Sequence, residues 1–274
     1  MMIRPFVLAG LTACVLIAIY GHNHGDGAEG DNGEEFVWRG EVPAGHWIHI
    51  RNTNGPVRID STGGSTVEVL ATKHWERGKP RDVRFKVTEE GNDVYVCALW
   101  GTRGRCGEHG YSASSPWWRK ISFFKRSDVR VNFTVRVPNG VKVNASTVNG
   151  AIAVRGAGDE VEVETVNGGI EATTTRGPIQ AQTVNGSIVA RMDSLAGEGD
   201  IQLETVNGSI TAYVPSAFDA ELEAETVNGR VTSDFPITTS GEITPKQLHG
   251  VIGRGGRSIS LETVNGSVRL LRGM

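Results

Sequence analysis

The 274-residue chain has few of the residues and patterns that would point to a known chemistry. It contains 3 cysteines, its aromatic residues make up 7% of the total, and its formal net charge is −3. Its serines lie in no nucleophile-elbow motif, no glycine-rich loop is placed to hold a phosphate, and the cysteines are too few for a zinc site. The weak negative charge argues against nucleic acid as a partner. We therefore expect no catalytic residues, no metal site and no cofactor.

Long apolar runs are also scarce, because the only one is residues 5–20, which carry no charge and follow Arg4. A membrane span needs about 20 apolar residues, so residues 1–20 are expected to be a signal peptide or a membrane anchor. A third alternative is a lipoprotein signal, in which Leu11-Thr-Ala-Cys14 resembles a lipobox and Cys14 carries the lipid. Each alternative places the body outside the cytoplasm, in the periplasm or on the outer surface, with the membrane as a partner through the N-terminus. Residues 21–35 are glycine-rich and acidic, which predicts a flexible tether.

What the chain does contain is a repeat. The tetrapeptide Thr-Val-Asn-Gly begins at Thr147, Thr165, Thr183, Thr205, Thr226 and Thr263. The intervals are 18, 18, 22, 21 and 37 residues, and self-similarity with such a period is typical of a solenoid.

Each repeat combines turn residues with an alternating apolar pattern of period 2, as in Val161-Glu-Val163-Glu. That period indicates strands rather than helices. Near-identical segments stack best on their own copies, and stacking buries an apolar face that one coil cannot bury alone. We therefore expect an all-β fold, a single-stranded parallel β-helix or β-solenoid over residues 36–274. The regular repeats occupy residues 131–274, with two strands in each coil of about 18 residues.

The Asn-Gly pairs are expected to be structural turns, because both residues tolerate a positive φ. An asparagine column at a solenoid corner can also form hydrogen bonds along the stack. The pairs are Asn149-Gly150, Asn167-Gly168, Asn185-Gly186, Asn207-Gly208, Asn228-Gly229 and Asn265-Gly266.

If the alternation continues through the tetrapeptide, Thr165 points inward and Val166 outward. The valines would then form an exposed apolar stripe, suited to self-association or to a partner; the alternative is a local bend that returns each valine inward. The stripe would consist of Val148, Val166, Val184, Val206, Val227 and Val264.

A column of acidic residues precedes the tetrapeptides. It comprises Glu164, Glu204, Glu225 and Glu262, with Gln182 in the same position. Paired carboxylates could serve a glycosidase-like enzyme, and carboxylate oxygens could bind calcium. We favour a solvated strand face, because this column follows the repeat, whereas a catalytic site interrupts one.

Residues 72–130 differ from the rest of the chain and are read as an insertion. They hold 13 Lys and Arg against 7 Asp and Glu, a net charge of +6, together with four tryptophans. Because the chain is expected to be exported, Cys97 and Cys106 are expected to form a disulfide that staples this loop. Aromatic rings stack on sugars and cations bind anions, so the insertion is a candidate site for an envelope polysaccharide or anionic lipid; packing is the alternative. The candidate residues are Trp100, Arg103, Arg105, Trp117, Trp118, Arg119 and Lys120.

Residues 131–143, Ser233-Asp-Phe-Pro236 and Gly250-Val-Ile-Gly253-Arg-Gly-Gly256 accompany the repeats. With them, residues 36–272 resemble a bacterial adhesin-like family with β-strand repeats, whose function is unknown. The resemblance implies a parallel β-helix, right-handed, and a cell-envelope location, and it carries no catalytic residues. We expect a non-enzymatic envelope solenoid that presents a repetitive surface to a polysaccharide, a lipid, another envelope protein or its own copies. The alternative is a carbohydrate-active β-helix enzyme of the polysaccharide lyase or hydrolase type.

Overall fold

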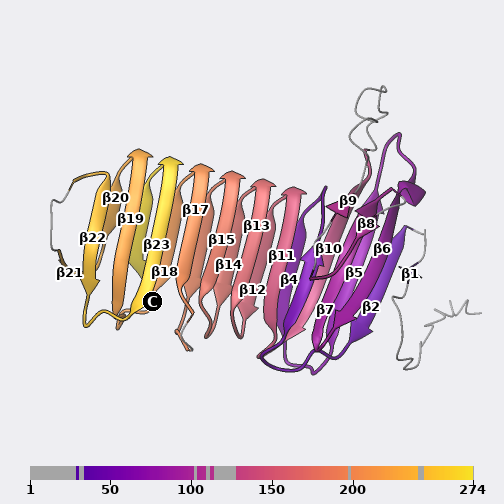
Figure 1. The fold of residues 1–274 in the computed structure, drawn as a ribbon, viewed down its shortest axis with the longest axis horizontal. Coiled ribbons are helices and arrows are strands. Elements are labelled where there is room, and N and C mark those ends of the chain that lie inside the picture. Colours follow the sequence, from indigo (N-terminus) through magenta and orange to yellow (C-terminus); the bar gives the residue numbers. More distant parts are fainter. Residues whose placement is uncertain are drawn as a thin grey trace, which may run out of the picture.

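The computed structural model describes residues 29–30, 34–101, 104–108, 112–113, 128–196, 199–239 and 244–273. Within these ranges the regular structure is β-strand, apart from one 3₁₀ turn, η1 (Pro80–Asp82). The strands form two long sheets that face each other along an elongated body (Figure 1). No helix in these ranges has the length and apolar character needed to cross a membrane. The predicted all-β solenoid is confirmed, whereas residues 1–20 with Cys14, and most of the tether, lie outside the described residues.

The larger sheet, sheet A, has twelve strands among the described residues. Their spatial order is β1 (Glu29–Gly30), β6 (Val83–Glu90), β7 (Asp93–Trp100), β3 (Trp47–Arg51), β11 (Lys142–Asn149), β13 (Val161–Asn167), β15 (Ile179–Asn185), β17 (Ile201–Asn207), β23 (Arg257–Asn265), β19 (Ala220–Asn228), β22 (Gln247–Ile252) and β21 (Ile237–Thr238).

The second sheet, sheet B, has ten strands in the described ranges. Their order is β2 (Glu35–Gly40), β5 (Val67–His74), β10 (Arg130–Pro138), β4 (Val57–Thr62), β12 (Ile152–Ala157), β14 (Ile170–Thr174), β16 (Ile188–Met192), β18 (Ile210–Val214), β24 (Val268–Arg272) and β20 (Val231–Ser233). A separate pair, β8 (Gly104–Arg105) and β9 (Ser112–Ala113), lies beside the N-terminal end of the body.

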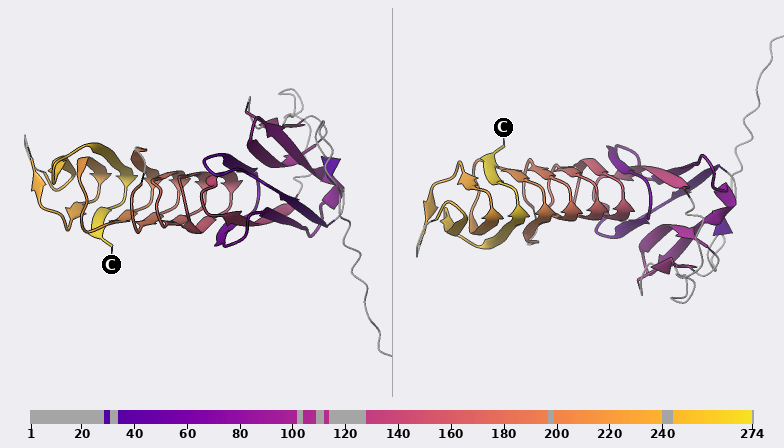
Figure 2. Two further views of the ribbon diagram at one scale, coloured as in Figure 1. Left: turned by 90° about the horizontal axis from the view of Figure 1, so that it is seen from below. Right: turned by 90° about the horizontal axis from the view of Figure 1, so that it is seen from above.

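Each coil of the solenoid supplies one strand to each sheet, and like residues stack on like residues. Asn149 pairs with Asn167, and Asn167 with Asn185, in parallel register. This register confirms that about 18 residues make one coil of two strands. Figure 2 shows the two sheets as facing rows of strands with short connections between them.

The core is a thin layer between the sheets, filled by the inward members of each alternation. On sheet B, Ile152, Ile170, Ile188 and Ile210 stack in successive coils, and each is at most 2% exposed. Burying one such side chain contributes about 1.5–3 kcal/mol. Each coil therefore depends on its neighbours for a core, as solenoids do.

The coils at the two ends do not stack in sequence order. At the C-terminal end, the last coil (β23, β24) inserts between the coil of β17 and β18 and that of β19 and β20. At the N-terminal end, the first coil (β3, β4) inserts between the strands β7 and β10 and the coil of β11 and β12. The 37-residue interval before the last Thr-Val-Asn-Gly is the loop out to the end of the solenoid and back.

Antiparallel strands close both ends of sheet A and the N-terminal end of sheet B. At the C-terminal end β22 pairs antiparallel with β19, and β21 with β22. At the N-terminal end β6 pairs antiparallel with β7, and β5 with β10. We call the first of these regions the C-terminal cap, and the second, together with β2 and β3, the N-terminal cap. Capping strands that interrupt the parallel stack limit edge-to-edge pairing with other chains.

Candidate functional site

The threonine of each Thr-Val-Asn-Gly repeat is a buried structural residue. All six threonines are between 1% and 6% exposed. Each hydroxyl donates a hydrogen bond of 2.7–3.1 Å to a glycine carbonyl in the neighbouring coil, as Thr183 does to Gly168. The acceptor is the repeat glycine in five cases and Gly55 of the first coil for Thr147. The threonine column therefore satisfies backbone carbonyls inside the solenoid, where an unpaired carbonyl would be costly.

The asparagines form a continuous hydrogen-bonded ladder, which was one of the two roles considered for them. Each side-chain amide donates to the side-chain oxygen of its neighbour over 2.8–3.0 Å. The spatial order of the ladder is Asn149, Asn167, Asn185, Asn207, Asn265 and Asn228.

The glycines are required for a different reason from the one predicted. None of the six repeat glycines has a positive φ; Gly55 in the first coil does, at 123°. A Cβ at any of the six would lie only 1.8–2.1 Å from the carbonyl oxygen of the corresponding glycine one coil away, for example Gly186 against Gly168. The expectation that the turn needs a positive φ was wrong: glycine is needed because adjacent backbones approach closely.

The valine is the member of the tetrapeptide that faces solvent. Val166 is half-buried and the other five are 38–56% exposed. Of the two orientations considered from the sequence, the outward one is therefore observed, and no bend returns these side chains inward. Threonine, asparagine and glycine each serve the stacking of coils, whereas the exposed valine makes no comparable contribution to the fold.

The valine column and the glutamate column together line one open groove on sheet A, with a volume of about 740 Å³. The groove crosses the strands from β13 to β19, and the C-terminal cap supplies its far rim through Thr244, Lys246 and Gln247. We call it the valine–glutamate groove. Its lining is Glu164, Gln182, Glu204, Glu225 and Glu262, the adjacent repeat threonines and valines, and the three cap residues.

The two outer faces of the solenoid differ in charge. On sheet A from β13 to β19, seven glutamates point outward: Glu162, Glu164, Glu204, Glu221, Glu223, Glu225 and Glu262. On sheet B from β4 to β24, four arginines point outward (Arg58, Arg155, Arg191 and Arg269) against two acids (Asp60 and Glu171). The groove therefore favours a cationic partner and disfavours an anionic polysaccharide or lipid.

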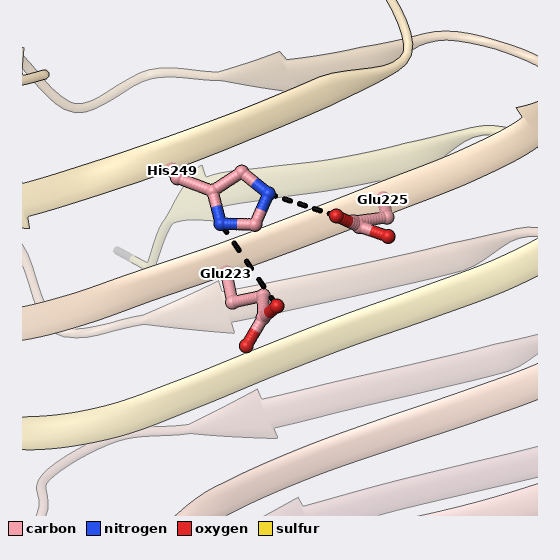
Figure 3. Close-up of side chains that lie close together, drawn as sticks. All are labelled: Glu223, Glu225 and His249. Atoms are coloured by element: carbon pink, nitrogen blue, oxygen red, sulfur yellow. Dashed lines mark hydrogen bonds and ion pairs between the residues drawn. The ribbon is translucent and has the colours of Figure 1, made fainter. Parts of the chain in front are cut away.

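A second cluster closes the C-terminal end of the groove, where Glu223 and Glu225 of β19 meet His249 of β22 (Figure 3). His249 Nε2 lies 2.8 Å from Glu225 Oε1, and Nδ1 lies 3.9 Å from Glu223 Oε1. The pKa of Glu225 is lowered by hydrogen bonds from Gln247 and then from His249.

One imidazole nitrogen and two carboxylate oxygens within 4.8 Å of one another form a donor set that can hold a first-row divalent metal. No metal site was predicted. Sequence analysis missed the cluster because His249 reaches β19 on an antiparallel return strand, and no repeat pattern indicates that pairing.

The insertion extends sheet A at the N-terminal cap. Cys97 and Cys106 form the predicted disulfide and are both buried. Trp100 is half-buried and packs against the core, while Arg105 is exposed. The other candidate ligand residues, Arg103, Trp117, Trp118, Arg119 and Lys120, lie outside the described residues.

A buried histidine sits in the N-terminal cap. His49 is 9% exposed and stacks on Tyr95, with ring centroids 4.1 Å apart. Burial, followed by the charge of Arg51, lowers the pKa of His49 to about 4. Arg51 donates a 2.6 Å hydrogen bond to the side-chain oxygen of Asn144, and the side-chain amide of Asn144 donates a hydrogen bond to the carboxylate of Glu162 on the next strand. This packing covers the outer face of sheet A where the groove is absent.

Comparison with known proteins identifies a family for this chain. The family model described as Toastrack DUF4097 matches residues 125–271, more than half of the chain. Two similar solved structures are a candidate cell adhesion protein from Clostridium sporogenes (11% identity, 87% of this chain and 99% of that chain, TM-score 0.49) and a candidate adhesin from Bacteroides fragilis (12%, 87% and 96%, TM-score 0.27). No curated protein matches the chain. The chain belongs to the Toastrack DUF4097 family.

Proposed function

We propose that this protein is a non-enzymatic β-solenoid of the cell envelope, whose valine–glutamate groove is a contact surface for adhesion, scaffolding or sensing. The observation that carries the proposal is the exposed valine column. The fold accounts for the threonine, asparagine and glycine of each repeat, yet the valine is repeated as faithfully as they are. Contiguous exposed apolar surface with a polar rim is typical of an interaction site.

The geometry of the groove favours an extended partner. Successive coils repeat the valine about every 4.8 Å, with a glutamate beside it in every coil of the groove except that of Gln182. A linear partner can therefore contact several coils at once. The carboxylates favour cationic groups beside apolar ones. An anionic polysaccharide or lipid would instead bind the basic insertion. Export and attachment through residues 1–20 complete the proposal and rest on sequence alone.

A carbohydrate-active enzyme is the second candidate, because one observation favours it. His249 adds an off-repeat group beside Glu223 and Glu225 at the end of the groove, and glycoside hydrolysis uses paired carboxyl groups. If this candidate holds, Glu225→Gln would abolish polysaccharide cleavage, whereas Glu171→Gln on sheet B would not.

A binding screen tests the proposal. The full chain in detergent would be titrated with envelope polysaccharides, anionic vesicles and basic peptides, with product analysis of each sample. We expect saturable binding without cleavage, weakened at least about tenfold, or 1.4 kcal/mol, by Val184→Lys with Val206→Lys. The matched control is Val189→Lys with Thr211→Lys, which changes the opposite faces of the same two coils. Unchanged binding by the folded groove variant, or cleavage of a substrate, would contradict the proposal.

A further inference from the structure

The valine–glutamate groove has a chemical counterpart elsewhere in this chain. Resting on the contact function proposed above, we propose that the groove binds residues 114–127 of a second copy. These residues belong to the basic insertion and lie outside the described residues. Their sequence, Ser-Ser-Pro-Trp-Trp-Arg-Lys-Ile-Ser-Phe-Phe-Lys-Arg-Ser, alternates short apolar and cationic pairs.

The charged residues of the two surfaces are opposite in sign and similar in number. The segment carries four cations and no acidic residue: Arg119, Lys120, Lys125 and Arg126. The groove is lined by four glutamates, with Lys246 as the single cation on its rim. Opposite charges steer the two surfaces together and disfavour anionic competitors.

The apolar parts match as well. The segment supplies Trp117, Trp118, Ile121, Phe123 and Phe124. The groove supplies Val166, Val184, Val206, Val264 and Val227 in spatial order. Large aromatic side chains contribute most binding free energy when they are buried against an apolar surface. The tryptophans of the segment belong to the residue types that dominate the binding free energy of interfaces.

The segment cannot fill the groove of its own chain. It is joined at both ends to the N-terminal cap. Ala113 of β9 precedes it, and Asp128, whose carboxylate accepts hydrogen bonds from the backbone N–H groups of Arg77 and Gly78, follows it. Seven strand spacings separate β7 from β19, or about 34 Å at 4.8 Å each. Fourteen residues that must double back reach about 24 Å at most. Only the tip of the loop could approach the middle strands, so the four cations can lie along the groove only in another copy.

The ends of sheet A are poor alternatives for contact between copies. At both of them antiparallel strands interrupt the parallel stack, and the edge strands of this sheet, β1 and β21, have two described residues each. Short edge strands limit pairing between chains. The face of sheet A between the caps is therefore the better surface for a second copy.

A segment-to-groove contact joins two different surfaces, so each bound copy keeps one free segment and one free groove. Such heterologous contacts form open chains unless the geometry closes a ring. The mass of the assembly is therefore expected to rise with concentration beyond that of a dimer, and salt is expected to reduce it.

Sedimentation velocity of the full chain in detergent tests this inference, because detergent suppresses association through residues 1–20. The segment variant replaces Arg119, Lys120, Lys125 and Arg126 with Glu, and the groove variant is Val184→Lys with Val206→Lys. We expect each to be monomeric at concentrations where the parent chain and the Val189→Lys, Thr211→Lys control associate. Glu204→Gln with Glu262→Gln provides a milder groove variant should the lysines prevent folding.

Mixing the two defective variants gives the most direct test of contact between segment and groove. The segment variant keeps an intact groove and the groove variant keeps an intact segment, so an equimolar mixture is expected to form a 1:1 complex and nothing larger. A fluorescent peptide of residues 114–127 is expected to bind the parent chain, with at least about tenfold loss of affinity in the groove variant.

The outcomes separate this inference from the proposed function. A mixture that stays monomeric, or a peptide that binds both proteins equally, would overturn the inference. If the groove variant loses a different partner found in the binding screen while the segment variant behaves like the parent, the contact function stands and the occupant is another molecule. A peptide that binds only anionic glycan would likewise overturn the inference.

Discussion

The central repeats and the two caps reach stability by different means. Between β11 and β17 every coil stacks on its sequence neighbour, and like residues occupy the same position in each coil. In the N-terminal cap the contacts are individual: Phe36 stacks on Phe85 at 4.8 Å, buried Lys73 donates to the carbonyl of Val83, and a disulfide closes the insertion. Repetition therefore stabilises the middle of the solenoid, whereas individual contacts stabilise its N-terminal end.

The largest expected effect comes from crowding the glycine column in the central repeats. In Gly186→Ala the new methyl group would lie 2.0 Å from the Gly168 carbonyl oxygen, so the coils must separate. Overpacking commonly costs 1–3 kcal/mol, and because backbone is in the way we expect a loss above about 3 kcal/mol in urea unfolding. Gly63→Ala is the matched control, since a Cβ there meets nothing within 4 Å. Equal stability of the two variants would refute the close-approach explanation.

The next effect belongs to the N-terminal cap and depends on pH. His49 has a folded-state pKa of about 4, below the ordinary value of 6.5. Its contribution is therefore present above pH 6.5 and lost as the pH falls toward 4. The shift corresponds to about 3 kcal/mol. His49→Phe, which can keep the stack on Tyr95, should flatten this part of the stability profile, whereas His74→Asn at an exposed site should leave it unchanged. A parallel pH dependence in the parent chain and His49→Phe would contradict this account.

The disulfide of the N-terminal cap should have a slightly smaller effect. It closes a loop between residues 9 apart in sequence, for which the chain-entropy relation gives about 2.7 kcal/mol. Replacing both cysteines with alanine should lower the free energy of unfolding by about that amount. The parent chain in reducing agent should unfold at the same denaturant concentration as the double variant. A variant as stable as the oxidised parent would show that packing alone holds the insertion.

The smallest effect returns to the central repeats. Thr183→Val keeps the side-chain volume but removes the 2.9 Å hydrogen bond to the Gly168 carbonyl. Leaving a buried acceptor unpaired costs about 1–3 kcal/mol, and we expect the lower half of that range. Thr211→Val on the outer face of sheet B serves as the control. Thermal unfolding that ranks the two variants equally would argue against a structural threonine column.

The same contrast explains what the sequence could predict. The strand period and the 18-residue coil were predicted because each recurs in every coil. The asparagine ladder and the outward valines were each one of two alternatives, since the sequence does not fix the backbone bend at the turn. The insertion of β23 between β17 and β19 and the meeting of His249 with Glu225 were not predictable, because each occurs once and depends on long-range pairing. The role of Gly186 was assigned to the wrong cause, since a turn preference and a close approach select the same residue.

We propose two roles for the residues of the tetrapeptide. Threonine, asparagine and glycine stabilise the stacking of the coils, and valine forms a contact surface for a partner. The most direct measurement compares Val184→Lys with Val206→Lys against the parent chain, recording the free energy of unfolding and the sedimentation coefficient on the same samples. We predict unchanged stability, within about 0.5 kcal/mol as for other surface substitutions, together with loss of association. A marked loss of stability, or unchanged association by the folded variant, would contradict the claim.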